Sequence, residues 1–198
     1  MTTLLSLVLI RIVVVTALSY GLSQYALEMV VRVLVLELIP LTAALFVALR
    51  CTIPNGAALA MMRRDGRFER LAQAGRDPVR SEALPRLLAG LFSTITLAAL
   101  SSVVAIVLAY LAVYGFTLAG VPAFTRLFGH VFNTSVSLIF ALKTLFFSLA
   151  VSAIPMASGL YDVGQDDTRE SAALSGLVRM FAVLLVLEAV SLVGNYYH

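Results

Sequence analysis

Charge is scarce in this sequence. Only 13% of its 198 residues are Asp, Glu, Lys or Arg, whereas soluble domains average about 25%. Residues 87–125 hold no charged residue at all, and 61% of the chain is hydrophobic. Because about 20 apolar residues can cross a bilayer as a helix, the composition predicts an integral membrane protein. The net charge of +3 does not indicate nucleic-acid binding, since the basic residues flank apolar segments.

Several motifs that indicate disulfide, metal, redox or catalytic sites are missing as well. The single cysteine, Cys51, excludes an internal disulfide and any CxxC metal or redox site, and we expect it to be a small buried apolar residue. His130 and His198 have no companion metal ligands nearby, so no metal site is predicted. The chain has neither a P-loop nor a G-x-S-x-G nucleophile motif. We therefore predict no catalytic residue and no cofactor held by this chain.

Apolar segments recur along one transmembrane domain comprising residues 1–198. The spans cover approximately residues 3–25, 33–62, 87–115, 131–157 and 172–196. We expect an all-α fold, because a helix satisfies its own backbone groups in lipid and the segments lack the alternation of barrel strands. Pro40 and Pro54 should bend the second span. The N-terminal segment lacks a basic region and is too long for a typical signal peptide, so we interpret it as a retained span.

The distribution of basic residues predicts the orientation. Residues 63–86 hold seven of the 14 Lys and Arg residues, whereas the connection 116–130 holds Arg126 alone. Since loops rich in Lys and Arg remain in the cytoplasm, the segment 63–86 should be cytoplasmic. Five spans then place the N-terminus inside and His198 outside, with a short helix expected in the outer connection 116–130.

The segment 63–86 has a helical pattern of its own. Small and apolar residues with the spacing of one helix face are Phe68, Leu71, Ala72 and Gly75; polar ones on the remaining surface are Arg67, Glu69, Arg70 and Gln73. This pattern predicts an amphipathic helix near residues 65–74, ended by a glycine. Asp77 and Pro78 then suit the N-cap and first position of a second start. The segment either docks a cytoplasmic partner or lies on anionic headgroups.

Charged residues within the predicted spans need partners or water, because each costs roughly 2.5–3.5 kcal/mol at mid-helix. They are Arg11, Glu37, Arg50, Lys143 and Glu188. We expect Glu37 to pair with Lys143 across a polar cavity. This pair is either a structural tie between helices or part of a cavity that recognises a charged headgroup. Arg50 could also extend toward the cytoplasmic surface.

An acidic loop offers a different hypothesis. Three acids lie close together near a predicted membrane surface: Asp162, Asp166 and Asp167. A lipid-headgroup enzyme could hold a divalent metal with such a cluster. The other interpretation is a solvated loop whose acids lie near a helix N-terminus.

Two sequence blocks resemble the MlaE family of ABC-transporter permeases. LELIPLTAALFVALR follows the family's E-x-G-P…A-L…R order with Glu37, Pro40, Ala44, Leu45 and Arg50. AGRDPVRSEALPRLLAG follows G-x-D-P-x-R-x-x-x-x-P-R with Gly75, Asp77, Pro78, Arg80, Pro85 and Arg86. Further along, FALKTLFFSLAVSAIPMASGLYD is similar to the family's fourth span and contains Lys143.

The resemblance implies a permease in the bacterial inner membrane that moves phospholipid or related lipid between membranes. Its expected partners are a cytoplasmic ABC ATPase, which would carry the ATP and Mg, a periplasmic MCE-domain protein, and a second permease copy or paralogue. Residues implied at the lipid cavity are Glu37, Pro40, Arg50 and Lys143. Residues implied in ATPase coupling are Arg67, Phe68, Glu69, Arg70, Leu71, Gly75, Asp77, Pro78 and Arg80.

The chain also departs from the family pattern. An interfacial helix usually precedes the first span, and we expect none here. Ile39 stands in place of the family's glycine and Leu36 in place of a common arginine, while Gly66 and Ala72 occupy positions where acids are typical. We interpret the chain as a divergent member. A scaffold that binds partners without transporting lipid is the remaining alternative.

Overall fold

The computed structural model describes Val8, residues 31–161 and residues 169–196. The predicted first span, except for Val8, and the acidic loop residues 162–168 lie outside these described residues. Every regular element within them is helical. The predicted all-α membrane fold is therefore confirmed.

The described helices form long rods joined by short connections. The first rod contains η1 (Val31–Leu38), α3 (Ile39–Val47), η2 (Ala48–Thr52) and α4 (Ile53–Arg64). After α5 (Arg67–Gln73), the second rod contains η3 (Val79–Ala83) and α6 (Leu84–Tyr114). The remaining elements are η4 (Leu118–Gly120), α7 (Val121–Val131), α8 (Thr134–Tyr161) and α9 (Arg169–Tyr196).

Within the described residues, four helical segments are long and apolar enough to cross a membrane. They are Arg32–Arg64, Val79–Tyr114, Thr134–Tyr161 and Gly176–Gly194. These segments correspond to the second through fifth predicted spans. The second rod begins earlier than predicted, because the restart after Asp77 continues directly into α6 and does not form a separate helix. The short helix expected in the outer connection is present as α7.

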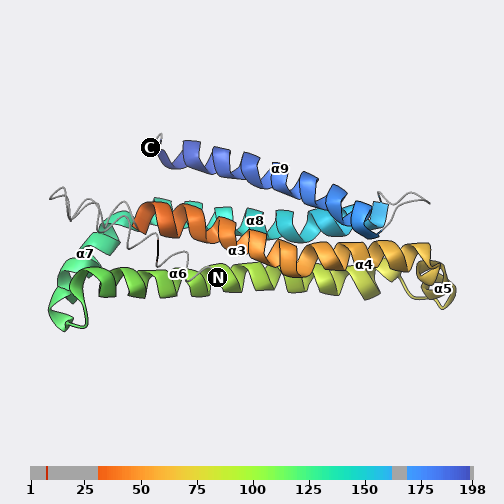
Figure 1. The fold of residues 1–198 in the computed structure, drawn as a ribbon, viewed down its shortest axis with the longest axis horizontal. Helices are drawn as coiled ribbons and strands as arrows, with labels where there is room; N and C mark the ends of the chain where they lie inside the picture. The colour runs from red at the N-terminus through yellow and green to blue at the C-terminus, as the bar shows by residue number, and fades with distance from the viewer. Residues whose placement is uncertain (1–7, 9–30, 162–168, 197–198) are drawn as a thin grey trace.

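Proline explains where the rods change from π-helical to α-helical geometry. The π-helical segments η1, η2 and η3 each end two residues before a proline, namely Pro40, Pro54 and Pro85. A proline has no N–H to donate to the preceding turn, and a wider π turn is one way to accommodate that loss. Figure 1 shows the first rod changing direction between α3 and α4, as the sequence predicted for the second span.

The rods lie side by side, with α5 at one end and α7 at the other (Figure 1). Near the α5 end, α4 and α8 approach closely: a Cβ on Gly56 would overlap the carbonyl of Pro155, and one on Gly159 would overlap Gly56. Small residues at helix contacts let backbones meet in this way. Figure 1 shows α9 following α8 from the α5 end and then diverging from it.

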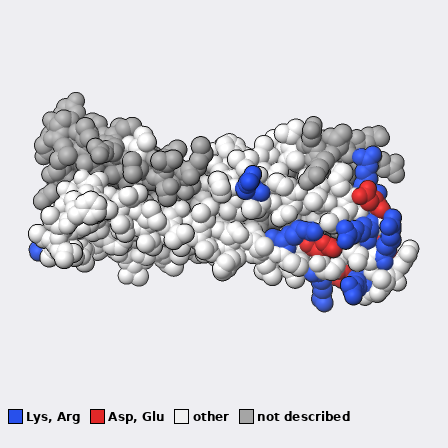
Figure 2. Space-filling model, turned by 60° about the horizontal axis from the view of Figure 1, so that its bottom comes forward, with Lys and Arg blue, Asp and Glu red and all other residues white. Residues whose placement is uncertain are grey.

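Charge gathers at the α5 end, which consists of residues 63–86. Figure 2 shows most of the Lys, Arg, Asp and Glu side chains of that face gathered around α5, with only isolated Lys or Arg side chains elsewhere on the described surface. The predicted order of helix, stop and restart is present. Gly75 has a φ of 72°, which favours glycine, and Asp77 Oδ1 accepts a hydrogen bond from the backbone N–H of Val79 at 2.9 Å.

Candidate functional site

Lys143 lies between two carboxylates contributed by different helices. Its Nζ donates a hydrogen bond to Glu37 Oε2 and lies 2.9 Å from Glu188 Oε2. Glu37 is in η1, Lys143 in α8 and Glu188 in α9. The predicted pairing of Glu37 with Lys143 is therefore confirmed, and Glu188 extends the pair to a triad, which we call the charge triad.

The charge triad is buried within a single chain. The side chains of Lys143, Glu37 and Glu188 are 3%, 8% and 15% exposed, respectively. Removing such ions from water costs several kcal/mol per ion, which is offset only when the charges are paired closely. One ammonium here serves two carboxylates, so the triad carries a formal charge of −1 when every group is ionised. This arrangement connects three helices at one point.

Apolar packing surrounds the charge triad on both sides. Toward the α7 end lies a buried cluster that includes Val35, Ile39, Ala105, Ala109 and Val131. Toward the α5 end lies a second cluster that includes Ala44, Val47, Phe147, Met180 and Leu184. The Phe147 ring lies one turn along α8, with its centroid 5.6 Å from Lys143 Nζ, within the range of a cation–π contact. The triad is thus a polar layer within an apolar core.

An apolar groove runs beside this polar layer. It has a volume of about 390 Å³ and lies between α6 and α8; its lining residues are Ile95, Ala99, Leu138, Phe140, Ala141, Leu142, Thr144 and Leu145. Thr144 follows Lys143 directly in α8. None of the triad residues lines this groove, so the groove itself offers an environment suited to an acyl chain.

Pro40 and Arg50, the other residues predicted at the cavity, lie in different surroundings. Pro40 is buried in α3, one turn after Glu37. Arg50 is exposed in η2, 13 residues after Glu37 and therefore about 20 Å away along the rod. The structure does not bring Arg50 together with the triad. Cys51 is also exposed, so its predicted burial is wrong, because no helix that the structure describes covers the adjoining face of the first rod.

The residues predicted for coupling occupy the α5 end. Exposed among them are Arg67, Glu69, Arg70, Gly75, Asp77 and Arg80. Phe68 is half-buried and packs against a small cluster formed by Leu59, Ala83 and Met156. Leu71 lines a surface hollow of about 510 Å³ with Asp65, Arg67 and Arg70. Phe68 therefore anchors α5 to the bundle, whereas Leu71, one turn further along the helix, borders an open hollow.

Glu188 is the functional candidate that sequence reasoning left without a partner. The sequence marks it as an acid within a predicted span, a position that demands a partner. Lys143 was already assigned to Glu37, and a two-carboxylate arrangement was not predicted. Asp162, Asp166 and Asp167 lie outside the described residues, and the residues that are described contain no cluster of three or more metal-ligating side chains.

Comparison with known proteins gives one family assignment. Residues 1–193 match the family model described as Permease MlaE. No curated protein shows a significant match to the chain. The matched range includes the charge triad, the groove beside it and the whole α5 end.

Proposed function

The chain belongs to the MlaE permease family, and from this premise we propose that it moves phospholipid or a related lipid between membranes. Membership makes it an ABC-transporter permease, a transport subunit rather than an enzyme. The observation that carries the proposal is the family match over nearly the whole chain. The apolar groove between α6 and α8 supports it, because this groove can hold an apolar chain of a lipid.

In this proposal the α5 end faces the cytoplasm of a bacterial inner membrane. Its excess of arginine favours that side. A separate ABC ATPase would bind ATP and Mg and dock at α5, and a periplasmic MCE-domain protein would lie beyond the α7 end. A second copy or paralogue of the permease would complete the transporter. The open side of α5, with Leu71 in a charged hollow, suits a partner that presents both apolar and polar groups.

The proposed mechanism is a change of shape coupled to the ATPase. A partner shifts a permease between two conformations only if it binds them differently. Movement of α5 would be transmitted to α4 and, through the close approach of Gly56 to Pro155, to α8. Because α8 carries Lys143, this movement would alter the charge triad. A lipid phosphate could then replace a carboxylate as the partner of Lys143. A headgroup ammonium could pair with the carboxylate that was released.

The experiment is lipid transfer by the reconstituted transporter. The permease, its ATPase and its MCE-domain partner are placed in donor vesicles, and ATP-dependent transfer of labelled phospholipid to acceptor vesicles is measured. We expect transfer with ATP and none without it. Glu37→Ala and Lys143→Ala should each lower the amount of lipid that co-purifies with the complex. Arg126→Gln is the control, because Arg126 is an exposed arginine of α7 and is not a member of the triad.

Two results would contradict parts of this proposal. Absence of ATP-dependent transfer by a correctly assembled complex would refute lipid transport. Unchanged lipid content in both triad variants, with transfer intact, would show that the triad is only a structural tie between helices.

A further inference from the structure

Arg50 is a cation on the apolar part of the first rod. It is exposed in η2 and makes no hydrogen bond or ion pair with any residue that the structure describes. Its exposed neighbours on the rod are apolar: Phe46 lies one turn before it and Leu49 precedes it directly. An arginine in such a place requires an anion or water, because a bare guanidinium is costly in lipid.

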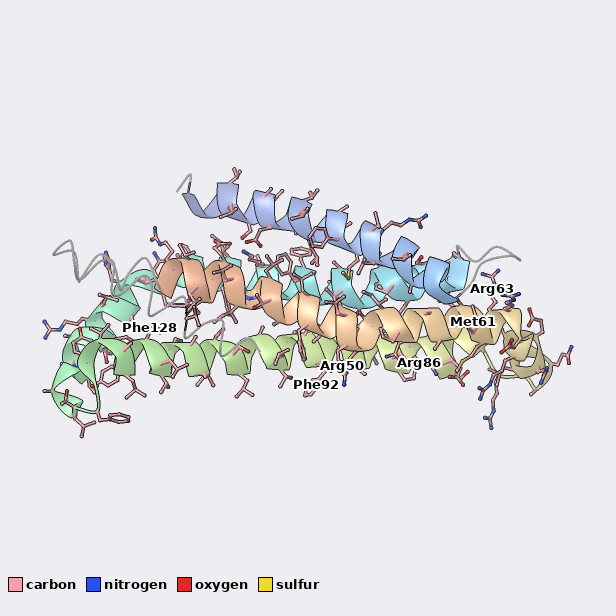
Figure 3. The ribbon with its side chains drawn as sticks, viewed as in Figure 1. Arg50, Met61, Arg63, Arg86, Phe92 and Phe128 are labelled. Carbon is pink, nitrogen blue, oxygen red and sulfur yellow. The ribbon has the colours of Figure 1, made fainter. Side chains whose placement is uncertain are left out.

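The depth of Arg50 follows from a contact between the rods. A Cβ on Gly90 of α6 would touch the side chain of Thr52, so these two residues lie at the same level. Arg50 is two residues from Thr52, toward the α7 end, and Arg86 is four residues from Gly90, toward the α5 end. Together these offsets separate the two arginines by about six helical residues. At 1.5 Å per residue, Arg50 therefore lies about 9 Å further from the α5 end than Arg86. Figure 3 accordingly shows Arg50 and Phe92 at nearly the same level along the rods.

The Arg50 side chain does not start toward the charged α5 end. Cα–Cβ bonds tilt toward the N-terminus of a helix, and the first rod runs from the α7 end to the α5 end. The stem of Arg50 therefore starts away from the arginines around α5. A counter-ion must come to the guanidinium at this depth.

The described acids of this chain do not offer that counter-ion. Glu37 and Glu188 both face Lys143 in the charge triad. The other described acids with described side chains all lie at the α5 end: Asp65, Glu69, Asp77 and Glu82. A second copy of the described residues would present no free carboxylate at the level of Arg50. The phosphate of a membrane lipid remains the anion best suited to this position.

We propose that Arg50 anchors a lipid-phosphate site on the outer face of the first rod, separate from the charge triad. The guanidinium binds the phosphate of a phospholipid from the leaflet on the α5 side, where a planar fork can donate two hydrogen bonds to phosphate oxygens. The acyl chains lie on Phe46, Leu49 and the exposed ring of Phe92. This site goes beyond the proposed function, since it requires neither an ATPase nor lipid transfer.

Cys51 provides a probe at the site. It is the only cysteine of the chain, it is exposed, and it follows Arg50 directly. The full-length permease in detergent is labelled there with bimane and titrated with nitroxide-bearing phosphatidylglycerol or with nitroxide-bearing diacylglycerol, which lacks the phosphate. We expect half-quenching at about tenfold lower concentration of the phosphatidylglycerol, the size expected of a charge-assisted hydrogen bond of modest strength.

Matched variants identify the responsible charge. Arg50→Gln should make the two lipids quench equally, whereas Arg50→Lys should keep part of the preference. Arg76→Gln removes an exposed arginine at the α5 end and should leave the preference intact. Native mass spectrometry of the unlabelled proteins should show fewer bound phosphatidylglycerol molecules for Arg50→Gln only, which removes any influence of the label.

Four outcomes would overturn the proposal. Equal quenching by the two lipids in the wild-type protein would show that no phosphate is recognised. A preference that persists in Arg50→Gln would place the phosphate elsewhere. If Arg50→Gln splits a permease dimer while lipid preference and bound lipid stay unchanged, Arg50 binds a protein. Millimolar inorganic phosphate should not displace the lipid, and displacement would assign the site to free phosphate.

Discussion

Lys143 pairs with Glu37 across 106 residues of sequence, and the same ammonium also faces Glu188. The charge triad joins η1 to α8 and α9. Toward the α5 end, the first rod and α8 are held by a second contact of a different kind, the backbone approach of Gly56 to Pro155 and Gly159. The first rod is thus tied to α8 by charge at one level and by close packing at another.

Removing the ammonium should cost more stability than removing either acid. Lys143→Met would leave two carboxylates facing each other in a buried site, and we expect a loss of about 3–5 kcal/mol, typical of a broken buried pair. Glu37→Gln and Glu188→Gln each leave one carboxylate with Lys143 and should cost less. Thermal unfolding in detergent, followed by circular dichroism, gives the order of stabilities.

A combined variant separates charge from packing in the same site. Glu37→Gln, Lys143→Met and Glu188→Gln together remove every charge and should recover much of the stability lost by Lys143→Met alone. If the triple variant is no more stable than Lys143→Met, the loss arises from packing of the lysine stem, and the explanation from unpaired charge is wrong.

The close contact between α4 and α8 should not tolerate a methyl group. Gly56→Ala and Gly159→Ala would each place a Cβ into backbone atoms of the facing helix, so we expect a clear fall in melting temperature. Gly129→Ala and Gly194→Ala are matched controls, because a Cβ at either helical position meets no atom within 4 Å. Alanine there should be neutral or stabilising by up to about 1 kcal/mol. An equal fall at all four positions would contradict the packing argument.

The positions of the spans could be predicted from the sequence because apolar length is a local property. Residues 33–62 were predicted as a span and Arg32–Arg64 is one continuous helical segment. The short helix of the charged segment was likewise predicted near residues 65–74 and observed as Arg67–Gln73. In both cases the signal is a pattern within a few turns of the chain.

Features that depend on which helix faces pack together were harder to predict from the sequence. The burial of Glu37 and Lys143 was expected because isolated charges in a span demand partners, but nothing local indicates that α9 brings Glu188 to the same lysine. Cys51 was predicted to be buried from its residue type alone, yet it lies on a face that no described helix covers. Arg50 was grouped with Glu37 through the resemblance to a family, whereas their separation along one rod excludes direct contact.

The restart after Gly75 should depend on Asp77. Its carboxylate accepts the Val79 N–H and lies 3.8 Å from Arg80, so Asp77→Ala should remove a capping interaction worth about 1 kcal/mol. We expect faster hydrogen exchange of the amides in η3, measured by mass spectrometry. Asp65→Ala is the control, since Asp65 is also exposed but lies before α5. Unchanged exchange in η3 would show that α6 alone holds this turn.

Binding of the ATPase at α5 should be separable from the packing of α5 against the bundle. Leu71→Asp changes the open hollow, so we expect it to abolish co-purification of the ATPase while the melting temperature of the permease stays unchanged. Phe68→Asp should lower both, because Phe68 packs against Leu59 and Met156 and its loss would unseat the helix. Gln73→Asp introduces the same charge on α5 outside the lining of the hollow and serves as the control.

The contrast between these variants decides what α5 does. Retained ATPase binding by Leu71→Asp would contradict a docking role for the hollow, even if Phe68→Asp lost binding, since an unseated helix can perturb a distant contact. Loss of binding by Gln73→Asp as well would mean that added negative charge repels the partner irrespective of position. Selective loss at Leu71 is the result that the geometry requires, because Leu71 is the apolar residue that lines the open hollow.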